Sequence, residues 1–435
     1  MTRRSTRRST RRSTGRSTST WHAAAVATAL SAMLAGCAGA GPAGSSGSAG
    51  GGLSGGRVTL GVLTDLTGTY AALAGPGAVE GVRLAVDDYR RKYGDKAVAK
   101  DIAVESADHQ NKPEVANTQA RELYERKGVD AIFDVPTSSA ALAVQTVAGQ
   151  QKKLYFNIGA ATPELAGKSC NKYTYAWAYD AYMLAFGTGA TVTAAGGRNW
   201  YVLYPDYAFG QAMQAGFEAA IRSAGGTVVA KDPTPFPNDN FSTFLLKAST
   251  LSPKPQVLGV MQAGGDLVNV VKQYNQFKLR DQGIKLAAGL ISDTDIEAIG
   301  ADNLAGTEFT TAWFWNMNAT TRTWADRFKE RTGKRPTFDH AANYSAATQY
   351  LEAVQRAGSD DPEKVRAQLD GLEFNDLFAA NARIRPEDHR VVHDAYLARV
   401  KPSAQAAEPA DATELVSAIP AAKAFGAPNP DCKLG

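Results

Sequence analysis

Strands and helices alternate along most of this chain, most clearly in its middle. Residues 131–135 and 154–158 are short apolar runs typical of buried strands, and an alanine-rich helical segment, 140–151, separates them. A polar loop with small residues follows each strand, at 136–139 and 159–165. Regular alternation of this kind predicts a parallel sheet with helices on both faces. We therefore expect an α/β fold.

The two loops should lie at one edge of that sheet, because consecutive parallel strands end at the same edge. Open α/β sheets hold their ligands there. The loops contain Thr137, Ser138, Ala160 and Thr162, which offer hydroxyls and reachable backbone N–H groups. A helix N-terminus beside them favours an anion such as a carboxylate. Ser and Thr are also ordinary helix N-caps, so the residues alone leave both roles open.

The same pattern begins again near residue 200. Residues 200–204 are a second apolar strand, and the loop 205–210 repeats the order of the loop 64–68, with an acid and then a glycine before a helix. A chain of 435 residues is long enough for two domains. We expect two lobes of similar plan, each a mainly parallel sheet flanked by helices and joined to the other by crossover strands.

Three later segments complete the expected layout. Residues 307–315 read as a strand that returns to the first lobe, residues 392–400 as a late strand, and the remainder as an alanine-rich tail. The predicted divisions are a signal peptide at 1–36, a flexible linker at 37–56, the first lobe at 57–177 and 312–385, and the second lobe at 178–311 and 386–435.

The first residues are typical of an export signal. Seven arginines precede a short apolar segment, and Leu34-Ala35-Gly36-Cys37 follows it. This ending resembles a bacterial lipoprotein signal, in which the cysteine is acylated and becomes the mature N-terminus. Cys37 would then anchor the protein to the outer face of the cytoplasmic membrane through the Gly/Ser-rich linker. The alternative is a simple secretory signal with an incidental cysteine.

The positive charge of the chain belongs to this signal. The chain has 47 Lys and Arg against 43 Asp and Glu, and residues 1–36 hold seven of the arginines and no acid, which leaves the remainder at −3. Nucleic-acid binding requires a basic patch in the folded part, and the sequence has none. Two cysteines remain, Cys170 and Cys432, and in an exported protein they predict one disulfide, with two free thiols as the alternative.

No catalytic or metal site stands out. His389 and His393 are four residues apart, but they lead into a strand, so we expect a solvated turn there. The sequence has no nucleophile elbow and no glycine-rich nucleotide loop. We expect no catalytic residues, no metal and no cofactor.

With these features in view, the chain resembles the type I periplasmic binding proteins, the solute receptors of branched-chain-amino-acid-type ABC importers. The motifs that carry the resemblance are the Leu-Ala-Gly-Cys signal and residues 63–68, 107–112, 129–144, 159–165, 206–210, 241–248, 263–269, 313–324 and 344–345. Residues 206–210, 240–242 and 263–266 are similar to a branch that binds amides, hydrophobic amino acids or aromatic acids.

The resemblance implies specific ligand-binding residues. In amino-acid-binding members a hydroxyl and a small-residue loop hold the carboxylate, at positions that match Thr137 or Ser138 and Ala160 with Thr162. An acid of the second lobe holds the ammonium, and the matching region offers Asp293. Aromatic side chains would form the apolar walls, although each of them could equally belong to the core. These candidates are Tyr70, Tyr207, Trp313 and Tyr344.

The resemblance also implies a mechanism, in which ligand docks on the first lobe and the second closes over it by hinge bending. The closed form of this monomer would deliver its ligand to a membrane permease. A sensor of the same fold that signals to a membrane protein is the alternative, and a hydrolase is a more remote one.

Overall fold

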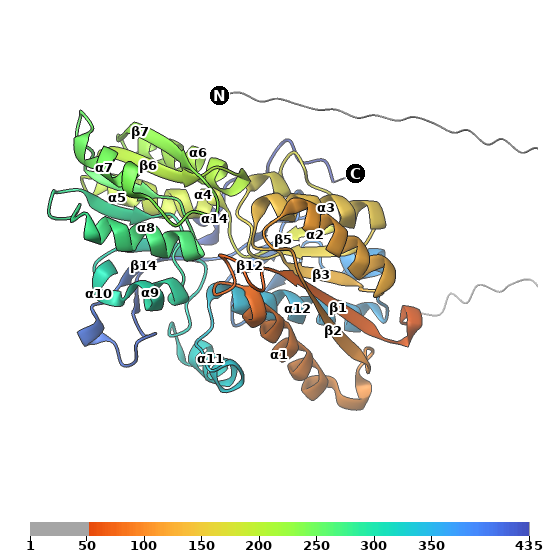
Figure 1. The fold of residues 1–435 in the computed structure, drawn as a ribbon. Helices are drawn as coiled ribbons and strands as arrows, with labels where there is room; N and C mark the ends of the chain where they lie inside the picture. The colour runs from red at the N-terminus through yellow and green to blue at the C-terminus, as the bar shows by residue number, and fades with distance from the viewer. Residues whose placement is uncertain (1–51, 435) are drawn as a thin grey trace, which may run out of the picture. The chain divides into compact units, whose positions relative to one another are not determined.

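A five-stranded parallel sheet forms the core of the first lobe. The computed structural model describes residues 52–434, and the strands follow the order β2-β1-β3-β4-β5 (Figure 1). Their bounds are Val58–Thr64 for β1, Ile102–Asp108 for β2, Ala131–Asp134 for β3, Leu154–Asn157 for β4 and Thr174–Ala176 for β5. The predicted signal peptide and Cys37 lie outside the described residues.

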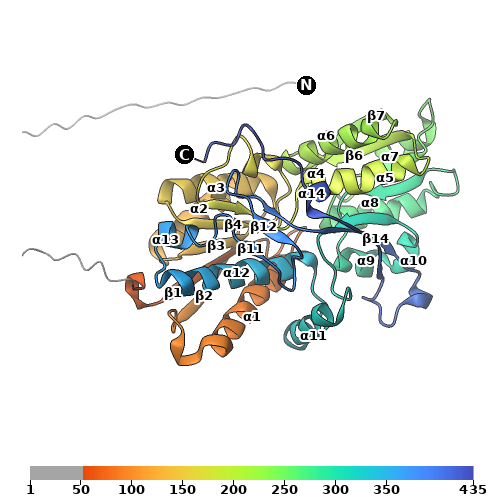
Figure 2. The same ribbon diagram turned by 180° about the vertical axis from the view of Figure 1, so that it is seen from behind.

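Helices cover both faces of this sheet. The helices α1 (Gly75–Tyr93) and α12 (Phe338–Ala357) pack together on one face, and α2 (Pro113–Arg121) and α3 (Ser138–Gln151) on the other (Figure 2). The side chains of each strand alternate between the two faces of the sheet, because successive strand residues point to opposite sides. Phe133 and Phe156 belong to the core on the α1 and α12 side, and Ile132 and Tyr155 to the core on the α2 and α3 side. The predicted α/β fold is confirmed.

A second parallel sheet, with order β7-β6-β8-β9, forms the core of the second lobe. Its strands are β6 (Asn199–Pro205), β7 (Thr227–Thr234), β8 (Val257–Val260) and β9 (Lys285–Ala288). Trp200 and Val202 pack toward α6, whereas Tyr201 and Leu203 pack toward α7 and α8. The helices are α4 (Ala181–Leu184), α5 (Thr191–Ala194), α6 (Ala208–Ser223), α7 (Ser242–Thr250), α8 (Gly264–Gln276), α9 (Asp293–Ile299) and α10 (Ala301–Leu304).

Two small antiparallel sheets differ from the expected layout. The predicted strand at 307–315 is only β10 (Glu308–Thr311), and it pairs with β14 (Ala395–Val400) instead of joining the first-lobe sheet. The predicted alanine-rich tail contains a further strand, β15 (Thr413–Ile419), on the other side of β14. The other small sheet holds β11 (Glu373–Phe374), β12 (Ala382–Ile384) and β13 (Val391–Val392).

The turn around His389 and His393 is buried rather than solvated. Both side chains are at most 1% exposed. The His389 ring stacks on Tyr175 with 4.5 Å between ring centroids, and His393 Nε2 lies 2.8 Å from the carbonyl oxygen of Ala178. A parallel bridge from Arg390 to Ala176 extends the first-lobe sheet at this point. The histidines therefore pack where the chain passes between the lobes.

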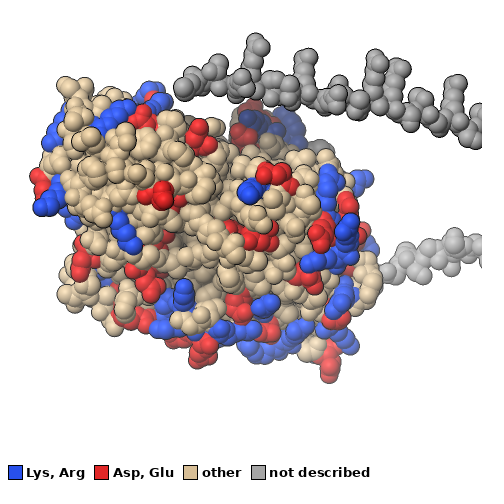
Figure 3. Space-filling view, viewed as in Figure 1, with Lys and Arg blue, Asp and Glu red and all other residues tan. Residues whose placement is uncertain are grey.

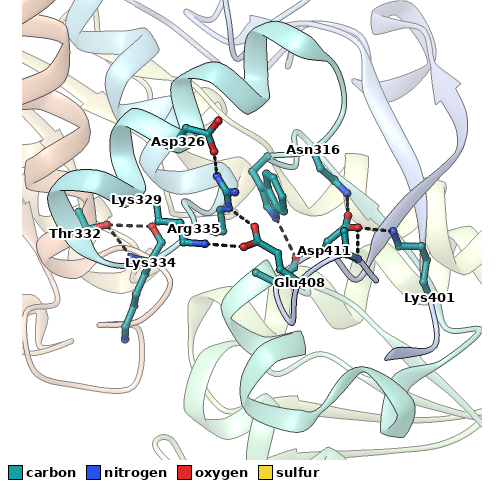
Figure 4. Close-up of polar contacts among 12 residues, drawn as sticks. Asn316, Asp326, Lys329, Thr332, Lys334, Arg335, Lys401, Glu408 and Asp411 are labelled. Carbon is teal, nitrogen blue, oxygen red and sulfur yellow. Dashed lines mark hydrogen bonds and ion pairs between the residues drawn. The ribbon is translucent and has the colours of Figure 1, made fainter. Parts of the chain in front are cut away.

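Polar contacts attach the loop between β14 and β15 to α11 (Ala319–Thr332) and the loop after it (Figure 4). The Arg335 guanidinium lies 4.0 Å from the Trp315 ring centroid and forms an ion pair with Glu408 at 2.5 Å. Lys329 Nζ also contacts Glu408, at 2.6 Å. Trp315 Nε1 donates to the carbonyl oxygen of Ala410 at 3.0 Å. These bonds link an element packed on α1 to a loop of the β10-β14-β15 sheet.

The chain end is tied to the first lobe by the predicted disulfide. Cys170 and Cys432 are bonded, with 5.5 Å between their Cα atoms. Two further short α-helices are α13 (Pro362–Arg366) and α14 (Ala421–Ala424). None of the helices within residues 52–434 is long and apolar enough to cross a membrane. Acidic and basic side chains are interspersed on the face shown in Figure 3.

Candidate functional site

A chain of hydrogen bonds joins the loops that follow β1, β2 and β3. The buried carboxylate of Asp65 accepts from Gly68 N at 2.7 Å, from Tyr70 N at 2.8 Å and from Asn111 Nδ2 at 2.5 Å. Asn111 Oδ1 in turn accepts from the Thr137 hydroxyl. The first three loops at this sheet edge are thus held in fixed relation, as a preformed binding site requires.

The loop after β3 combines backbone strain with an unpaired hydroxyl. Asp134 and Val135 have φ of 82° and 66°, a region that side chains other than glycine rarely adopt and that is most unusual for a β-branched residue. Such strain concentrates at functional sites. Ser138 Oγ, at the start of α3, is buried and has no hydrogen-bond partner among the described residues. With the N-terminus of α3 it offers an unused donor to an anion.

Thr162 and Ala160 lie in the loop after β4, and both are buried. Thr162 Oγ1 accepts from Glu164 N at 3.4 Å, so Thr162 caps the short helix Pro163–Ala166. Its hydroxyl hydrogen is not used by that bond and can still be donated. Asn157 Nδ2 donates to the Ala160 carbonyl oxygen at 2.9 Å, which fixes the loop from below.

A buried pair of acids supports these loops from beneath. Asp134 is fully buried, as is Asp339 on the first turn of α12, and Asn343 Nδ2 donates to Asp339 Oδ1 at 2.9 Å. Burial raises the pKa of Asp134 to about 7, and burial together with the neighbouring Asp134 raises the pKa of Asp339 as well. A Cβ atom on Gly159 would lie 2.8 Å from Asp339 Oδ2, so only glycine fits above the pair.

Tyr70 and Tyr207 meet where the two lobes face each other. Their hydroxyl oxygens are 2.5 Å apart, and Tyr207 directly precedes α6 of the second lobe. The Phe236 ring stacks on both, with centroid distances of 5.7 Å to Tyr70 and 4.4 Å to Tyr207. Burial, followed by the proximity of Tyr207, raises the pKa of Tyr70 well above its ordinary value. Both phenols are therefore neutral hydrogen-bonding groups at physiological pH.

Two further bonds cross between the lobes beside these rings. Gly265 N donates to the Thr69 carbonyl oxygen at 2.9 Å, and Thr69 Oγ1 donates to Asp266 Oδ1 at 3.3 Å. Asp266 Oδ2 accepts from Asn238 N at 3.0 Å. Burial raises the pKa of Asp266 to about 6, although the hydrogen bonds from Asn238 and Thr69 act to lower it. We name Thr69, Tyr70, Tyr207, Phe236 and Asp266 the seam cluster.

Asp293, the predicted ammonium ligand, makes its side-chain contact within the second lobe. Its Oδ1 accepts from the Thr413 hydroxyl of β15 at 3.2 Å, and its side chain is buried. Burial raises its pKa to about 7. No described contact joins Asp293 to the first lobe or to the seam cluster.

Trp313 and Tyr344 lie around α11 rather than in the seam cluster. Trp313 Nε1 donates to the Leu377 carbonyl oxygen at 3.0 Å, and its buried ring packs edge-on against Trp324. The Tyr344 hydroxyl donates to Asp88 Oδ2 at 2.8 Å. Tyr344 also lines a cavity of about 370 Å³ with Trp324 and Arg327. The structure thus brings together Tyr70 and Tyr207 of the four predicted aromatic residues.

Sequence reasoning did not single out the residues that hold this site together. Asp65 and Asn111 were visible as polar residues after strands, which is the signal that could have identified them. Asp266 ends the motif 263–266, which indicated the family branch without giving this residue a role. Phe236 carried no such signal, because an aromatic residue in a loop is common. Among residues 52–434 no group of three or more His, Cys, Asp or Glu side chains is placed to hold a metal ion.

Comparison with known proteins agrees with this architecture. A family model described as periplasmic binding protein matches residues 57–407. The Leu/Ile/Val-binding protein homolog 3 of Brucella melitensis is 24% identical over 305 residues, which are 70% of this chain and 80% of that protein.

Two crystal structures are more similar. A periplasmic binding protein of Burkholderia mallei is 39% identical with a TM-score of 0.81, and the match covers 86% of this chain and 97% of that one. A branched chain amino acid ABC transporter periplasmic ligand-binding protein of Burkholderia xenovorans is 37% identical with a TM-score of 0.74, over 85% and 97% of the two chains.

Proposed function

The chain belongs to the periplasmic binding protein family, and on that premise we propose that it is the substrate-binding protein of an ABC importer. It captures a small solute between its lobes and presents it to a membrane permease outside the cytoplasm. The observation that carries the proposal is the pairing of two half-sites. Unused donors lie at the strand ends of the first lobe, and Tyr207 of the second lobe meets Tyr70 across from them.

The proposed first-lobe site binds an anionic group. Ser138, Thr137 and the N-terminus of α3 lie on one loop, and Ala160 and Thr162 lie on the next. A carboxylate there would accept from the free Ser138 hydroxyl, from the Thr162 hydroxyl and from backbone N–H groups. The strained backbone at Asp134 and Val135 supports this assignment, because such strain persists where a loop must be held in one conformation.

The proposed second-lobe contribution is apolar and aromatic. Tyr207 and Phe236 offer flat surfaces that would pack on the hydrophobic part of a ligand, with Tyr70 closing the site from the first lobe. Branched-chain or hydrophobic amino acids, amides and aromatic carboxylates all fit this description. Three predicted residues lie away from this site: the wall residues Trp313 and Tyr344 and the ammonium ligand Asp293. They would contact the ligand only if closure of the lobes around it brings them to the site.

Hinge bending would open and close this site. Three segments pass between the lobes, from β5 to α4, from β10 to α11 and from β13 to β14. We propose that the chain passes from one lobe to the other near residues 177 and 311, the first two boundaries predicted from the sequence. Because β13 still pairs with β12, we place the third crossover after Val392. Ligand that contacts both lobes would favour the closed form over the open one.

We also propose that a lipid on Cys37 attaches the protein to the membrane, because residues 34–37 are Leu-Ala-Gly-Cys. Replacement of Cys37 by serine should release the protein from the membrane fraction and abolish its labelling by a radioactive fatty acid. A Cys37→Ser protein that stays labelled in the membrane fraction would refute the anchor.

A thermal-shift screen of the purified protein tests the binding function. The panel holds branched-chain amino acids, short amides and benzoate-like acids. A ligand at 100 times its dissociation constant should stabilise the folded protein by about 2.7 kcal/mol. Breakdown of a stabilising compound in the same sample would point to an enzyme instead of a binding protein.

A further inference from the structure

We infer that Asp339 carries a proton that it shares with Asp134, and that this acid pair positions the two loops of the proposed anion site, so that an anionic ligand and a proton bind together. The inference rests on the proposed binding function. It gives a positioning role to two residues that need not contact the ligand.

The pair lies directly beneath both loops. Asp134 is the last residue of β3, shortly before Ser138 at the start of α3, and Asp339 belongs to the first turn of α12. A Cβ atom on Gly159 would lie 2.8 Å from Asp339 Oδ2 and 2.8 Å from the Cα atom of Pro136. The carboxyl group of Asp339 therefore packs against the loop after β4 where that loop meets the loop after β3. Its charge acts on both loops at short range.

The two acids are buried without a counter-charge. Both side chains are fully buried, and they lie within hydrogen-bonding reach of each other. Asn343 is the one side chain of residues 52–434 that donates to the pair, and both carboxylate oxygens of Asp134 and Oδ2 of Asp339 have no hydrogen-bond partner there. Two ionised carboxylates held this close and away from water repel each other. A proton between them removes one charge and satisfies two of these oxygens.

The contacts place this proton on Oδ2 of Asp339. Its other oxygen, Oδ1, already accepts from Asn343 Nδ2 at 2.9 Å. Burial, followed by the neighbouring Asp134, raises the pKa of Asp339 well above its ordinary value. Burial also raises the pKa of Asp134, but the hydrogen bond with Asp339 opposes that rise. An O–H group of Asp339 that donates to an ionised Asp134 is the arrangement that agrees with all of these contacts.

The other ionisable groups that face the pair are an acid and two phenols. The charge of Asp65 adds to the effect of burial on the pKa of Asp134. Tyr155 and Tyr179 are buried beside the pair, and burial, followed by the acids, raises their pKa values as well. The Tyr179 hydroxyl donates to the Gly159 carbonyl oxygen rather than to either carboxyl group. None of these groups can replace the proton as a source of positive charge.

The proton decides how the first lobe receives an anion. While it is present, the pair has a single negative charge, and the Asp339 hydroxyl holds Asp134 at the strained turn where Asp134 and Val135 have φ of 82° and 66°. When it is lost, a second negative charge forms beneath the Ser138 hydroxyl and the N-terminus of α3, and it repels a carboxylate bound there. By linkage, an anion that binds at this site raises the affinity of the pair for its proton.

Isothermal titration calorimetry from pH 6 to pH 8.5 tests this coupling on the purified protein, with leucine and benzoate as probes. Both probes keep an ionised carboxylate over this range. We expect the affinity of a bound probe to fall at least ~5-fold from pH 6 to pH 8.5, because a coupling of one pKa unit corresponds to about tenfold. Binding near pH 7.5 should also take up part of a proton, seen as different heats in phosphate and in Tris buffer.

Two variants separate the pair from other buried acids. Asp339→Asn has the shape of the protonated acid and keeps a donor for Asp134, so at pH 8.5 it should bind as tightly as the wild type does at pH 6, without proton uptake. Asp130→Asn is the matched control. Asp130 is a buried acid whose pKa burial raises, and it directly precedes the β3 strand that Asp134 ends. It should keep the wild-type pH profile.

Several results would overturn the inference. One is a wild type whose affinity for a bound probe is the same at pH 6 and pH 8.5, a measurement that needs no variant to fold. Others are a pH profile that persists in Asp339→Asn or disappears in Asp130→Asn, and a panel in which only uncharged amides bind. If no compound of the panel binds at any pH, the proposed function fails first and the inference with it.

Discussion

The hydroxyl of Tyr70 is hydrogen-bonded to the hydroxyl of Tyr207 across the boundary between the two lobes. The bond joins the first loop of one parallel sheet to the first loop of the other. It is therefore a direct contact between corresponding positions of two similarly built halves, and movement of the two lobes apart would break it.

Replacing Tyr70 by phenylalanine removes this bond and keeps the ring. A single hydrogen bond contributes about 0.5–1.5 kcal/mol. We expect the ligand-free protein to shift toward open forms, seen as a larger radius of gyration in small-angle X-ray scattering. Tyr274→Phe is the control, because its hydroxyl donates to the Ile284 carbonyl oxygen within one lobe. An unchanged scattering curve for Tyr70→Phe would show that the bond does not hold the lobes together.

Replacing Thr162 by alanine should weaken ligand binding by roughly 1–3 kcal/mol if its hydroxyl holds a carboxylate. Stability should also fall by about 1 kcal/mol, because Thr162 caps the helix Pro163–Ala166. Thr162→Ser retains the hydroxyl and should restore both. Titration calorimetry and chemical denaturation separate the two effects. If affinity is unchanged while stability falls, Thr162 is a cap and not a ligand residue.

The stability contribution of Asp293 should depend on pH. Burial raises its pKa to about 7 in the folded chain, against about 3.9 in an unfolded chain. Between these values the folded state holds a proton that the unfolded state has lost, so stability falls as the pH rises through this range. Asp293→Asn should therefore become progressively more stable than the wild type from pH 4 to pH 8 in denaturant titrations.

Asp302→Asn provides the contrasting case for that experiment. Asp302 accepts from the Ser403 hydroxyl and backbone N–H, and these bonds lower its pKa. Its contribution is present above the ordinary aspartate pKa of about 3.9 and is lost only as the pH falls below that value, so the effect of Asp302→Asn should stay nearly constant from pH 4 to pH 8. If the stability of both variants relative to the wild type changed with pH in the same way, Asp293 would not hold the proposed proton in the folded state.

Removal of the disulfide should lower the melting temperature. The bond joins residues 262 positions apart, and the chain-entropy model allows about 5 kcal/mol for a loop of this length, with smaller values common in practice. Cys170→Ser/Cys432→Ser should melt at a lower temperature than the wild type. Reduction of the wild type should give the same shift and leave the double variant unaffected. Mass spectrometry that finds two free thiols in the untreated protein would refute the bond.

The alternation of strands and helices was predictable from the sequence, because the local spacing of apolar residues determines it. The strand at 131–135 and the helix at 140–151 correspond to β3 and α3, and the strand at 154–158 corresponds to β4. The partner of β10 was not predictable, because a short strand carries no information on which of two sheets it joins. The strand β15 was missed because most of its side chains are exposed and its sequence lacks a buried run.

The loops of the site were predictable for a similar reason, since polar residues after parallel strands must lie at one sheet edge. The contacts between lobes were not. Phe236 and Asp266 matter because of what faces them, and residues such as Thr69 and Tyr70 lie far away in the sequence. The surroundings of His389 were missed likewise, because Tyr175 reaches it from another segment.

The Cys170–Cys432 bond has a consequence for how the protein is made. Cys170 is synthesised long before Cys432, since 262 positions separate them in the sequence. The bond can therefore form only after nearly the whole chain has been made. Until then Cys170 is a free thiol, and correct maturation requires that it does not react with another thiol first.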